Sequence, residues 1–445
     1  MLPSLRRAGW LSVGLPLLTL SIELAACGGK TTQMPALADS SLRPDPSANI
    51  IVPAGKPIVI GVSVPLSGPD SSAGEEDRDA VIAGVNRWKE ENSETILGHE
   101  IVVQAEDDGC TETDITVQAA ERLLRTVGLV GVIGPNCSAG AQAAIPVYRE
   151  AGIVAVSGSV TRTDLTSGQN GGGFFFRTAY RNDLQGTLIG LFASAQLRGK
   201  AAYIIDDSEE YGQDLADAAQ HAMEASDVQI TRESIERGTV DFTTLAARIA
   251  RDNPAFVGFA GFNPEAALLY RQLRDAGYGG IFGAGDAAAS LRDFVQPVGA
   301  EEAEGVVFSG CPLNLAPDFV TNFTRVHGSA PEASVFVGQY ADATAVLLNA
   351  VAAVAQEQPD GSLAIDPGEL RDAVAVADLP DGVSGAIAFD ANGDRVPERG
   401  ANVAEVTNTA IRTADLQVFV RLGLVPCQVQ EGKLVNPLES IQGGS

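Results

Sequence analysis

From Pro57 onward, short runs of β-branched and other apolar residues alternate with longer stretches that have the amphipathic period of a helix. Such alternation is typical of parallel sheets that helices cover on both faces. The pattern runs through two successive series of strands and helices without a low-complexity break. The sequence therefore predicts an α/β fold with two Rossmann-like lobes, each built on a parallel-type sheet, joined by several hinge crossings.

The individual elements follow from the same pattern. The expected strands are residues 58–64, 101–105, 129–133, 153–156, 201–205, 228–234, 256–259 and 305–308. The expected helices are residues 73–91, 114–126, 138–150, 183–198, 211–225, 264–276 and 334–355. Residues 282–286 are expected to form a loop. We expect lobe 1 to comprise residues 57–180 and 310–388, lobe 2 residues 181–309 and 389–430, and a C-terminal tail residues 431–445.

Residues 1–26 have the features of a lipoprotein signal peptide. Two arginines precede an apolar run, and Leu-Ala-Ala stands directly before Cys27. A leader with small residues ahead of cysteine resembles a bacterial lipobox, which would make Cys27 the lipidated first residue of the mature chain. An ordinary secretory leader cut nearby is the alternative. Residues 27–56 are expected to form a flexible tether, and no later apolar stretch is expected to reach membrane-spanning length.

Charge and cysteine content narrow the functional classes. The chain has 57 acidic and 30 basic residues, so polyanions such as nucleic acids would be repelled over most of its surface. Four further cysteines could form two disulfides in an oxidising compartment, with three pairings possible: Cys110, Cys137, Cys311 and Cys427. A metal site would need close Cys or His pairs, but the three histidines are scattered and there is no CxxC motif, so no metal or other cofactor is expected.

Polar residues follow the predicted strands where a ligand of an open α/β sheet would bind. After the strand that ends at residue 133, Ser138 is expected to be the N-cap of a helix whose hydroxyl and amide groups can hold a carboxylate. After the next strand, Ser159 and Thr161 lie in a run dense in hydroxyls. Each junction alone could be an ordinary cap or turn, but two adjacent junctions favour a shared anion site.

The second series offers a complementary set of side chains at its strand ends. Tyr211, Phe262 and Asp286 lie in three successive junctions and would present two aromatic rings and a carboxylate. A zwitterion could then be held by hydroxyls and amides of one lobe and by Asp286 of the other.

At this point the order of several short motifs becomes informative. They are Gly61 to Pro69, Glu106 to Cys110, Ile133 to Ser138, Tyr211-Gly212 and Gly385 to Asp394. From Pro57 to about Val420, the chain resembles the family of leucine, isoleucine and valine binding proteins. These are the type I periplasmic receptors, with a Venus-flytrap fold, of branched-chain amino acid ABC transporters.

The resemblance implies roles for individual residues. Ser138 would bind the ligand carboxylate, Ser159 and Thr161 would contact both carboxylate and ammonium, Tyr211 would close over the ligand, and Asp286 would receive the ammonium. It also implies a disulfide between two of the cysteines, Cys110 and Cys137, which leaves Cys311 and Cys427 for each other.

Two departures from the family concern the side-chain pocket. Ala73 stands where many relatives have an aromatic residue, and Phe262 with Asn263 replaces a tyrosine-rich segment. The anchors for the amino-acid backbone are thus kept, while the ligand side chain could be larger or more polar than a branched aliphatic one.

The sequence as a whole predicts a non-catalytic, monomeric receptor, lipid-anchored on the extracytoplasmic side, that delivers an amino acid to an ABC permease. An amide, urea or aromatic acid as solute, or a sensor role with a signalling partner, are alternatives. An enzyme is disfavoured because there is no complete Gly-x-x-x-x-Gly-Lys-Ser/Thr phosphate loop and no nucleophile elbow. A calcium loop at residues 390–394 is disfavoured because Arg395 stands where such a loop needs glycine.

Overall fold

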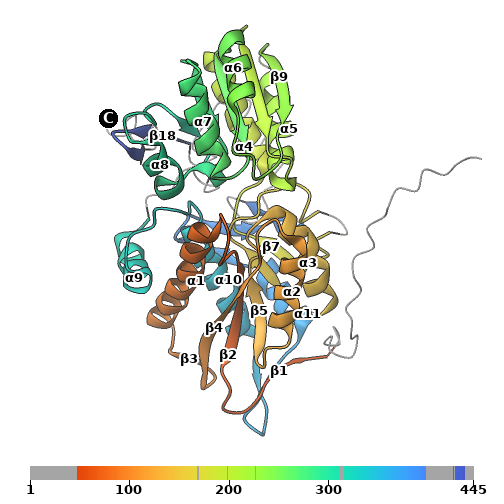
Figure 1. Ribbon diagram of the computed structural model, residues 1–445. Coiled ribbons are helices and arrows are strands. Elements are labelled where there is room, and N and C mark those ends of the chain that lie inside the picture. Colours follow the sequence, from red (N-terminus) through yellow and green to blue (C-terminus); the bar gives the residue numbers. More distant parts are fainter. Residues whose placement is uncertain are drawn as a thin grey trace, which may run out of the picture. The chain divides into compact units, whose positions relative to one another are not determined.

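The computed structural model describes residues 48–167, 170–197, 199–225, 227–310, 315–396, 424 and 426–435. Within these residues, two large sheets carry helices on both faces and form the centres of two lobes (Figure 1). The predicted α/β fold with two lobes is confirmed. Two smaller three-stranded sheets complete the described part of the chain.

The sheet of the first lobe has six strands in the order β3-β4-β2-β5-β6-β7. They are β2 (Ile58–Val64), β3 (Thr95–Ile96), β4 (His99–Asp107), β5 (Leu129–Ile133), β6 (Ala155–Ser157) and β7 (Phe175–Arg177). Neighbouring strands are parallel except for β3 with β4. Strands β2 and β5 have the predicted bounds and are buried along their whole length, which explains their nearly continuous apolar sequences.

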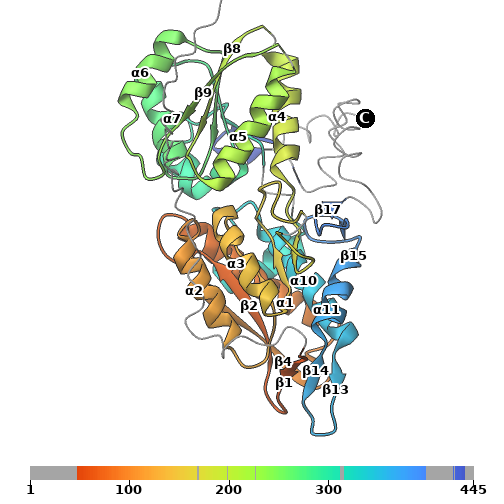
Figure 2. The ribbon, with the colours of Figure 1, turned by 90° about the vertical axis from the view of Figure 1, so that its right-hand side faces the viewer.

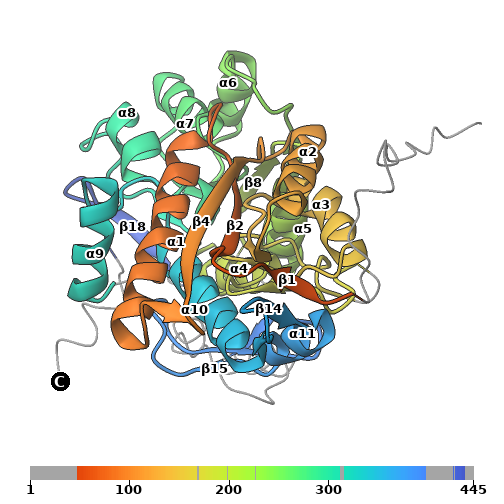
Figure 3. The same ribbon diagram turned by 90° about the horizontal axis from the view of Figure 1, so that it is seen from below.

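Helices cover both faces of this sheet (Figure 3). On one face lie α2 (Thr113–Leu124) and α3 (Ser138–Glu150), which pack against each other. On the other lie α1 (Ser71–Glu91) and α10 (Val337–Val354). Two further helices pack outside this second pair, α9 (Pro317–His327) against α1 and α11 (Pro367–Ala375) against α10.

The sheet of the second lobe has seven strands in the order β19-β18-β12-β11-β10-β8-β9. They are β8 (Ala201–Asp206), β9 (Gln229–Ser234), β10 (Phe256–Ala260), β11 (Ile281–Ala284), β12 (Val307–Phe308), β18 (Cys427–Gln430) and β19 (Lys433–Val435). The strands from β9 to β12 are parallel, and β18 and β19 extend the sheet in antiparallel fashion.

The helices of the second lobe also form two layers (Figure 2). One layer holds α4 (Asn182–Gln196) and α5 (Glu210–Glu224), and the other holds α6 (Thr243–Asp252) and α7 (Glu265–Asp275). Between β11 and β12 lie three short helical turns: η2 (Asp286–Ala288), η3 (Leu291–Val295) and α8 (Gln296–Val298).

Two small sheets join segments that are distant in sequence. The first consists of β1 (Ile50–Val52), β14 (Leu363–Ile365) and β13 (Gln356–Glu357), and the second of β15 (Asp378–Leu379), β16 (Ile387–Phe389) and β17 (Arg395–Val396). In the second, Arg395 donates to the carbonyl of Thr178, and Asp394 pairs with Arg177 at the end of β7. This sheet therefore belongs with the first lobe.

These pairings correct two expected boundaries. Residues 389–396 do not begin the second part of lobe 2, because β16 pairs with β17 beside the first lobe. The C-terminal tail does not begin at residue 431, because Lys433–Val435 forms a strand that pairs with β18. Residues 397–423 lie outside the described part of the chain, so the position of the return crossing stays a prediction.

The expectation that no apolar stretch after the leader reaches membrane-spanning length was wrong. Helix α10 has 18 residues with a mean hydropathy of 1.2, enough by length and composition. In the structure 72% of this stretch is buried, because α10 packs against α1, α11 and strands β5 and β6. Its apolar sequence is thus accounted for by a core position.

Residues 282–286 do not form a loop throughout, because Ile281–Ala284 is strand β11 of the second sheet. This strand lacks the β-branched run that marks the others, since it packs very closely against Phe256. A Cβ atom on Gly283 would lie 2.7 Å from the ring of Phe256. The close approach requires glycine and so removes the signal by which a strand is recognised in sequence.

Candidate functional site

A cavity of about 70 Å³ lies where the strand ends of both sheets approach each other. From the first lobe it is lined by Asp70, Ala73, Asp77, Asn136, Cys137, Ser138, Ser159, Ala333, Ser334, Val335 and Phe336. From the second lobe it is lined by Tyr211, Phe262, Asp286 and Ala287. Five of the six site residues that the sequence predicts therefore line a single cavity; Thr161 is not among the lining residues.

Ser138 lies at the start of α3, although it does not cap the helix as expected. The N-cap is Cys137, whose backbone is extended, and Ser138 is the first helical residue. Its hydroxyl oxygen accepts a hydrogen bond from the backbone amide of Arg162 at 3.3 Å. The hydroxyl proton can therefore still be donated, and together with the first amide groups of α3 it can bind a ligand oxygen.

Ser159 offers the opposite hydrogen-bonding character. Its hydroxyl donates to the carbonyl of Asn136 at 2.7 Å and lies 2.8 Å from the Tyr340 hydroxyl. Because its proton is engaged, its oxygen is suited to accept from a ligand N–H group. Thr161 is 1% exposed, and its carbonyl accepts from the backbone amide of Asn182, the first residue of α4. The structure thus places Thr161 against the segment that crosses to the second lobe.

Asp286 is the first residue of η2 and is 2% exposed. Its carboxylate accepts from the Tyr211 hydroxyl at 2.5 Å, from the Gln185 side chain at 2.8 Å and from the Ala287 amide at 2.8 Å. Burial raises the pKa of Asp286 to about 6, although the hydrogen bonds from Tyr211 and Tyr180 lower it. All of these partners are neutral, so a cationic ligand group would find an uncompensated carboxylate here.

Phe262 follows β10 and forms an aromatic wall of the cavity. Its ring centroid lies 5.0 Å from that of Tyr211, and the Arg237 guanidinium lies over the Phe262 ring, 4.1 Å from the centroid. Arg237 also donates from Nη2 to both oxygens of Asp70, at 2.8 and 2.6 Å. Since Asp70 precedes α1 and Arg237 precedes α6, this ion pair joins the two lobes beside the cavity.

On the α1 side of the cavity, Ala73 was expected in the side-chain pocket, whereas Asp70 and Asp77 were not predicted from the sequence. Asp70, Ala73 and Asp77 follow one another at spacings of three and four residues, so they share one stripe of this helix. Asp77 is 1% exposed and accepts from the Ser334 hydroxyl at 2.6 Å and from the Asn136 side chain at 2.7 Å. Charge alone could not have identified Asp77, because α1 carries acidic residues on several faces.

The neighbouring Glu76 shapes the wall opposite α3. Its carboxylate accepts four hydrogen bonds, between 2.9 and 3.0 Å, from the backbone amides of residues 332–334. The segment that leads into α10 is thereby fixed to α1. Since Ser334 and the residues beside it line the cavity, Glu76 positions that wall without lining the cavity itself.

A disulfide joins Cys110 and Cys137, whose Cα atoms are 5.0 Å apart. It ties the turn after β4 to the N-cap of α3, next to Ser138. The pairing implied by the family resemblance is thus present in the structure. Cys427 is buried in β18, with its sulfur 3.3 Å from the carbonyl of Gly310, while Cys311 lies outside the described residues. Their pairing stays a prediction.

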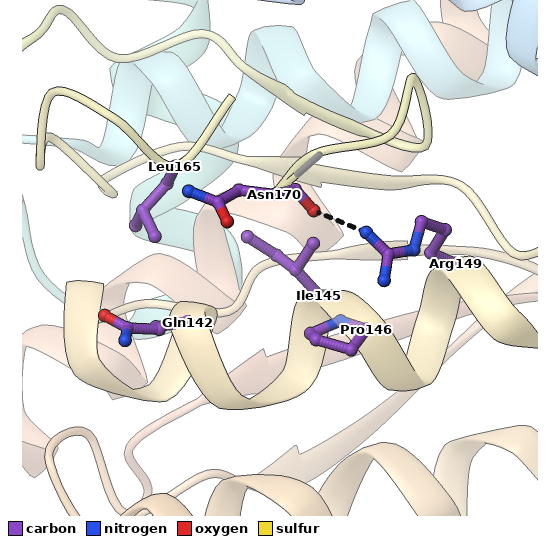
Figure 4. A pocket seen from close by; sticks show the side chains of 6 residues that line it. All are labelled: Gln142, Ile145, Pro146, Arg149, Leu165 and Asn170. Atoms are coloured by element: carbon purple, nitrogen blue, oxygen red, sulfur yellow. Dashed lines mark hydrogen bonds between the residues drawn. The ribbon is translucent and has the colours of Figure 1, made fainter. Parts of the chain in front are cut away.

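A second cavity of about 460 Å³ lies within the first lobe beside α3 (Figure 4). It is lined by Gln142, Ile145, Pro146, Arg149, Leu165 and Asn170. Arg149 spans one side of it by donating to the carbonyl of Asn170 at 3.1 Å. None of the site residues predicted from the sequence lines this cavity.

The side chains and amides of the first cavity offer hydrogen bonds and negative charge to a bound solute. The cavity combines hydroxyl and amide donors at α3 with acceptors at Ser159 and Asp286, which suits a solute that carries both an anionic and a cationic group. Among the described residues, no three His, Cys, Asp or Glu side chains are grouped so that they could hold a metal ion.

Comparison with known proteins agrees with this geometry. A family model described as periplasmic binding protein matches residues 57–410. An amino acid binding protein of Pseudomonas aeruginosa is 31% identical over 281 residues, 62% of this chain and 73% of that protein. A Leu/Ile/Val-binding protein of Citrobacter freundii is 26% identical over 344 residues, 76% of this chain and 88% of its own length.

Solved structures show the same fold. The leucine-binding protein LivK of Thermotoga maritima has a TM-score of 0.67 at 24% identity, covering 86% of this chain and 99% of its own. The substrate-binding protein LivJ of Streptococcus pneumoniae, in complex with isoleucine, has a TM-score of 0.68 at 20% identity, covering 85% and 98%. The family match, together with the two-lobed fold, shows that the chain belongs to the type I periplasmic binding proteins, the family of the Leu/Ile/Val-binding proteins.

Proposed function

We propose that this protein is the extracytoplasmic receptor of an ABC uptake transporter and binds a free α-amino acid between its two lobes. The observation that carries the proposal is the pairing of Ser138 at the start of α3 with Asp286 at the start of η2, one from each lobe, in one cavity. Ser138 and the amides of α3 would hold the carboxylate, and Asp286 would hold the ammonium. The names of the relatives, which include leucine, isoleucine and valine, support an amino acid as the solute.

We assign no catalytic step to the cavity. Its side chains supply hydrogen bonds and charge from both sides of a solute, and the family consists of binding proteins. After closure of the lobes around the solute, the receptor would deliver it to a permease in the cytoplasmic membrane.

Lipid anchoring belongs to the same proposal. Cys27 follows Leu-Ala-Ala at the end of the leader, and residues 27–56 would tether the lobes to the membrane. Because Cys27 and most of the tether lie outside the described residues, the proposal is supported by the sequence alone. Cys27→Ser should abolish metabolic labelling with a radioactive fatty acid and release the protein from the membrane fraction; unchanged labelling would refute the anchor.

The binding proposal is tested by a thermal-shift screen of the mature protein against amino acids, amides, ureas and aromatic acids. A ligand at 100 times its Kd should stabilise the protein by about 2.7 kcal/mol. Stabilisation by an amino acid is the expected result. Stabilisation only by solutes without an ammonium group would point to the alternative solute classes and remove the role given to Asp286.

The role of Asp286 is tested by Asp286→Asn. Removing one partner of a buried charge pair should weaken amino-acid binding by at least about thirtyfold in calorimetric titration. Asp372→Asn is a matched control, since Asp372 is an exposed residue of α11 that does not line the cavity. Equal affinity of the Asp286 variant and the control would disprove the ammonium site.

A further inference from the structure

The charges around the ligand cavity are strongly one-sided. Three carboxylates line it, those of Asp70, Asp77 and Asp286, and no Lys, Arg or His is among the described lining residues. A cleft lined by one sign of charge raises the local concentration of solutes of the opposite sign. A lining carboxylate that has no cationic partner within the protein is available to bind a cationic group of the solute.

Asp70 has such a partner. Arg237 binds both of its oxygens, and the guanidinium is held in place by its position over the Phe262 ring. The ion pair gives Asp70 a counter-charge, although the same guanidinium also lies 3.8 Å from the Asp207 carboxylate.

Asp77 and Asp286 have none. Asp77 contacts the hydroxyl of Ser334 and the amide of Asn136, and the hydrogen bonds of Asp286 come from equally neutral donors. No cation among the described residues forms an ion pair with either carboxylate. An amino acid with an aliphatic side chain brings a single ammonium group, which would compensate only one of them. The other would have no counter-charge and could avoid the cost of an isolated buried charge only by binding a proton.

The surroundings of Asp77 add further negative charge. Glu76, the residue before Asp77 in α1, carries another carboxylate. The carboxylate of the buried Asp108 accepts from the backbone amide of Asn136, and the side chain of Asn136 donates to Asp77. The pKa of Asp77 is raised to about 8, chiefly by burial and also by the charges of Glu76 and Asp108, while its hydrogen bonds from Ser334 and Asn136 lower it. Of the groups on α10, Tyr340 shares the Asn136 side chain as a partner and adds no positive charge.

We propose that the solute is an α-amino acid with a short basic side chain, whose α-ammonium group is bound by Asp286 and whose side-chain ammonium group is bound by Asp77. This inference rests on the proposed function. A short side chain follows from the cavity, whose volume of about 70 Å³ is well below the 300–1,000 Å³ that is common for small-molecule sites. The small residue Ala73, on the same stripe of α1, leaves Asp77 accessible from the cavity.

The test compares pairs of amino acids that have the same number of side-chain atoms and differ in charge. 2,4-Diaminobutyrate is compared with norvaline, and ornithine with norleucine, by calorimetric titration of the mature protein purified in detergent. We expect the basic member of at least one pair to bind tenfold or more tightly than its uncharged counterpart. This comparison needs no variant, so it does not depend on whether a substituted protein folds.

Asp77→Asn provides the second arm, with Asp372→Asn as the matched control. The Asp77 variant should lose at least tenfold of the preference for the basic member, while the control keeps it. A structural role alone would change the affinities of both members of a pair together. Titration of the unsubstituted protein in buffers of different ionisation enthalpy at pH 7 should also show release of a proton with the basic ligand and none with norvaline.

The outcomes separate this inference from the proposed function. If norvaline or norleucine binds as well as or better than its basic counterpart, the receptor function stands and the basic side chain is disproved. If no α-amino acid binds at all, both fail. A preference for the basic ligand that Asp77→Asn leaves unchanged would disprove Asp77 as the group that binds it.

Discussion

At the scale of single residues, the same side chain type serves four different purposes around the cavity. Glu76 accepts backbone amides and fixes a wall, while Asp70 forms an ion pair between the lobes. Asp286 accepts hydrogen bonds from neutral donors, and Asp77 lies near the carboxylates of Glu76 and Asp108. What distinguishes them is the partner of each carboxylate.

The raised pKa of Asp77 predicts a specific dependence of stability on pH. A carboxyl group with a higher pKa in the folded state binds more protons there than in the unfolded chain between about pH 4 and pH 8. The free energy of unfolding of the ligand-free protein should therefore fall as the pH rises through this window. A single such group contributes a slope of at most about 1.4 kcal/mol per pH unit.

Asp77→Asn removes this titration and should make the decline shallower. Denaturant unfolding at pH 5, 6, 7 and 8, with Asp372→Asn alongside, measures the difference. Other buried carboxyls whose pKa is raised, such as Asp207 and Asp286, leave a residual slope in both proteins. Identical pH profiles for the two variants would show that Asp77 does not titrate in this range.

How far the site could be predicted from the sequence also depends on individual residues. Ser138, Ser159, Tyr211, Phe262 and Asp286 all follow strands directly, where the topology of an α/β sheet gathers side chains. Asp77 lies two turns inside a helix, and its position on the buried stripe is not apparent from charge alone, because α1 carries acidic residues on several faces. Asn136 and Ser334 contact the same carboxylate from segments about 200 residues apart, which no local pattern reveals.

At the scale of elements, helix α1 is held against the first sheet by a very close contact at its second turn. A Cβ atom on Gly74 would lie 1.8 Å from the carbonyl oxygen of Pro65. Since the obstacle is backbone, a larger residue could be accommodated only if the helix moved, and Ala73 and Asp77 would move with it. The glycine thus sets the position of the cavity wall.

Gly74→Ala should therefore destabilise the protein by about 1–3 kcal/mol, as overpacking of a close contact usually does. The gain in helix propensity of about 1 kcal/mol offsets only part of this effect. Gly279→Ala is the matched control, because nothing lies within 4 Å of its Cβ position. Chemical denaturation measures both variants, and equal stability of the two would show that α1 can move freely.

The elements that the sequence did not predict share a physical cause. Helices α6, α9 and α11 have 9 to 11 residues; α6 lies between two predicted strands, and α9 and α11 follow the last predicted strand. By contrast, α3 begins and ends at the predicted residues because it follows a buried strand and a turn rich in small residues. A helix is therefore easier to predict when it directly follows a buried strand of a central sheet, and short peripheral helices lack this signal.

At the scale of the whole molecule, the two lobes are joined beside the cavity by several polar contacts between side chains. Arg237 pairs with Asp70, Ser72 donates to Asp293 at 2.6 Å, and Thr163 donates to Asp214. None of these contacts involves the groups to which we assign the solute carboxylate or ammonium. They are therefore suited to stabilise the closed arrangement of the lobes independently of which solute is bound.

The Arg237 and Asp70 pair can be tested by a double-mutant cycle with Arg237→Gln and Asp70→Asn. We expect each single variant to weaken ligand binding and the double variant to weaken it by less than the sum, with a coupling of about 0.5–3 kcal/mol. Calorimetric titration gives the affinities, and small-angle scattering of the liganded protein reports whether the lobes stay closed. Additive effects would show that the pair does not act as a unit, and an Arg371→Gln variant on exposed α11 serves as the control.

The disulfide between Cys110 and Cys137 makes the structure beside the cavity depend on the compartment in which the chain is found. A thiol pair of this kind is oxidised and kept so outside the cytosol, whereas the cytosol keeps thiols reduced. The N-terminus of α3, where Ser138 lies, would accordingly lack this covalent link while the chain is still inside the cell that made it. With the proposed function, such a receptor would mature only in the compartment where its solute is found, and it would bind the same solute less well inside the cell.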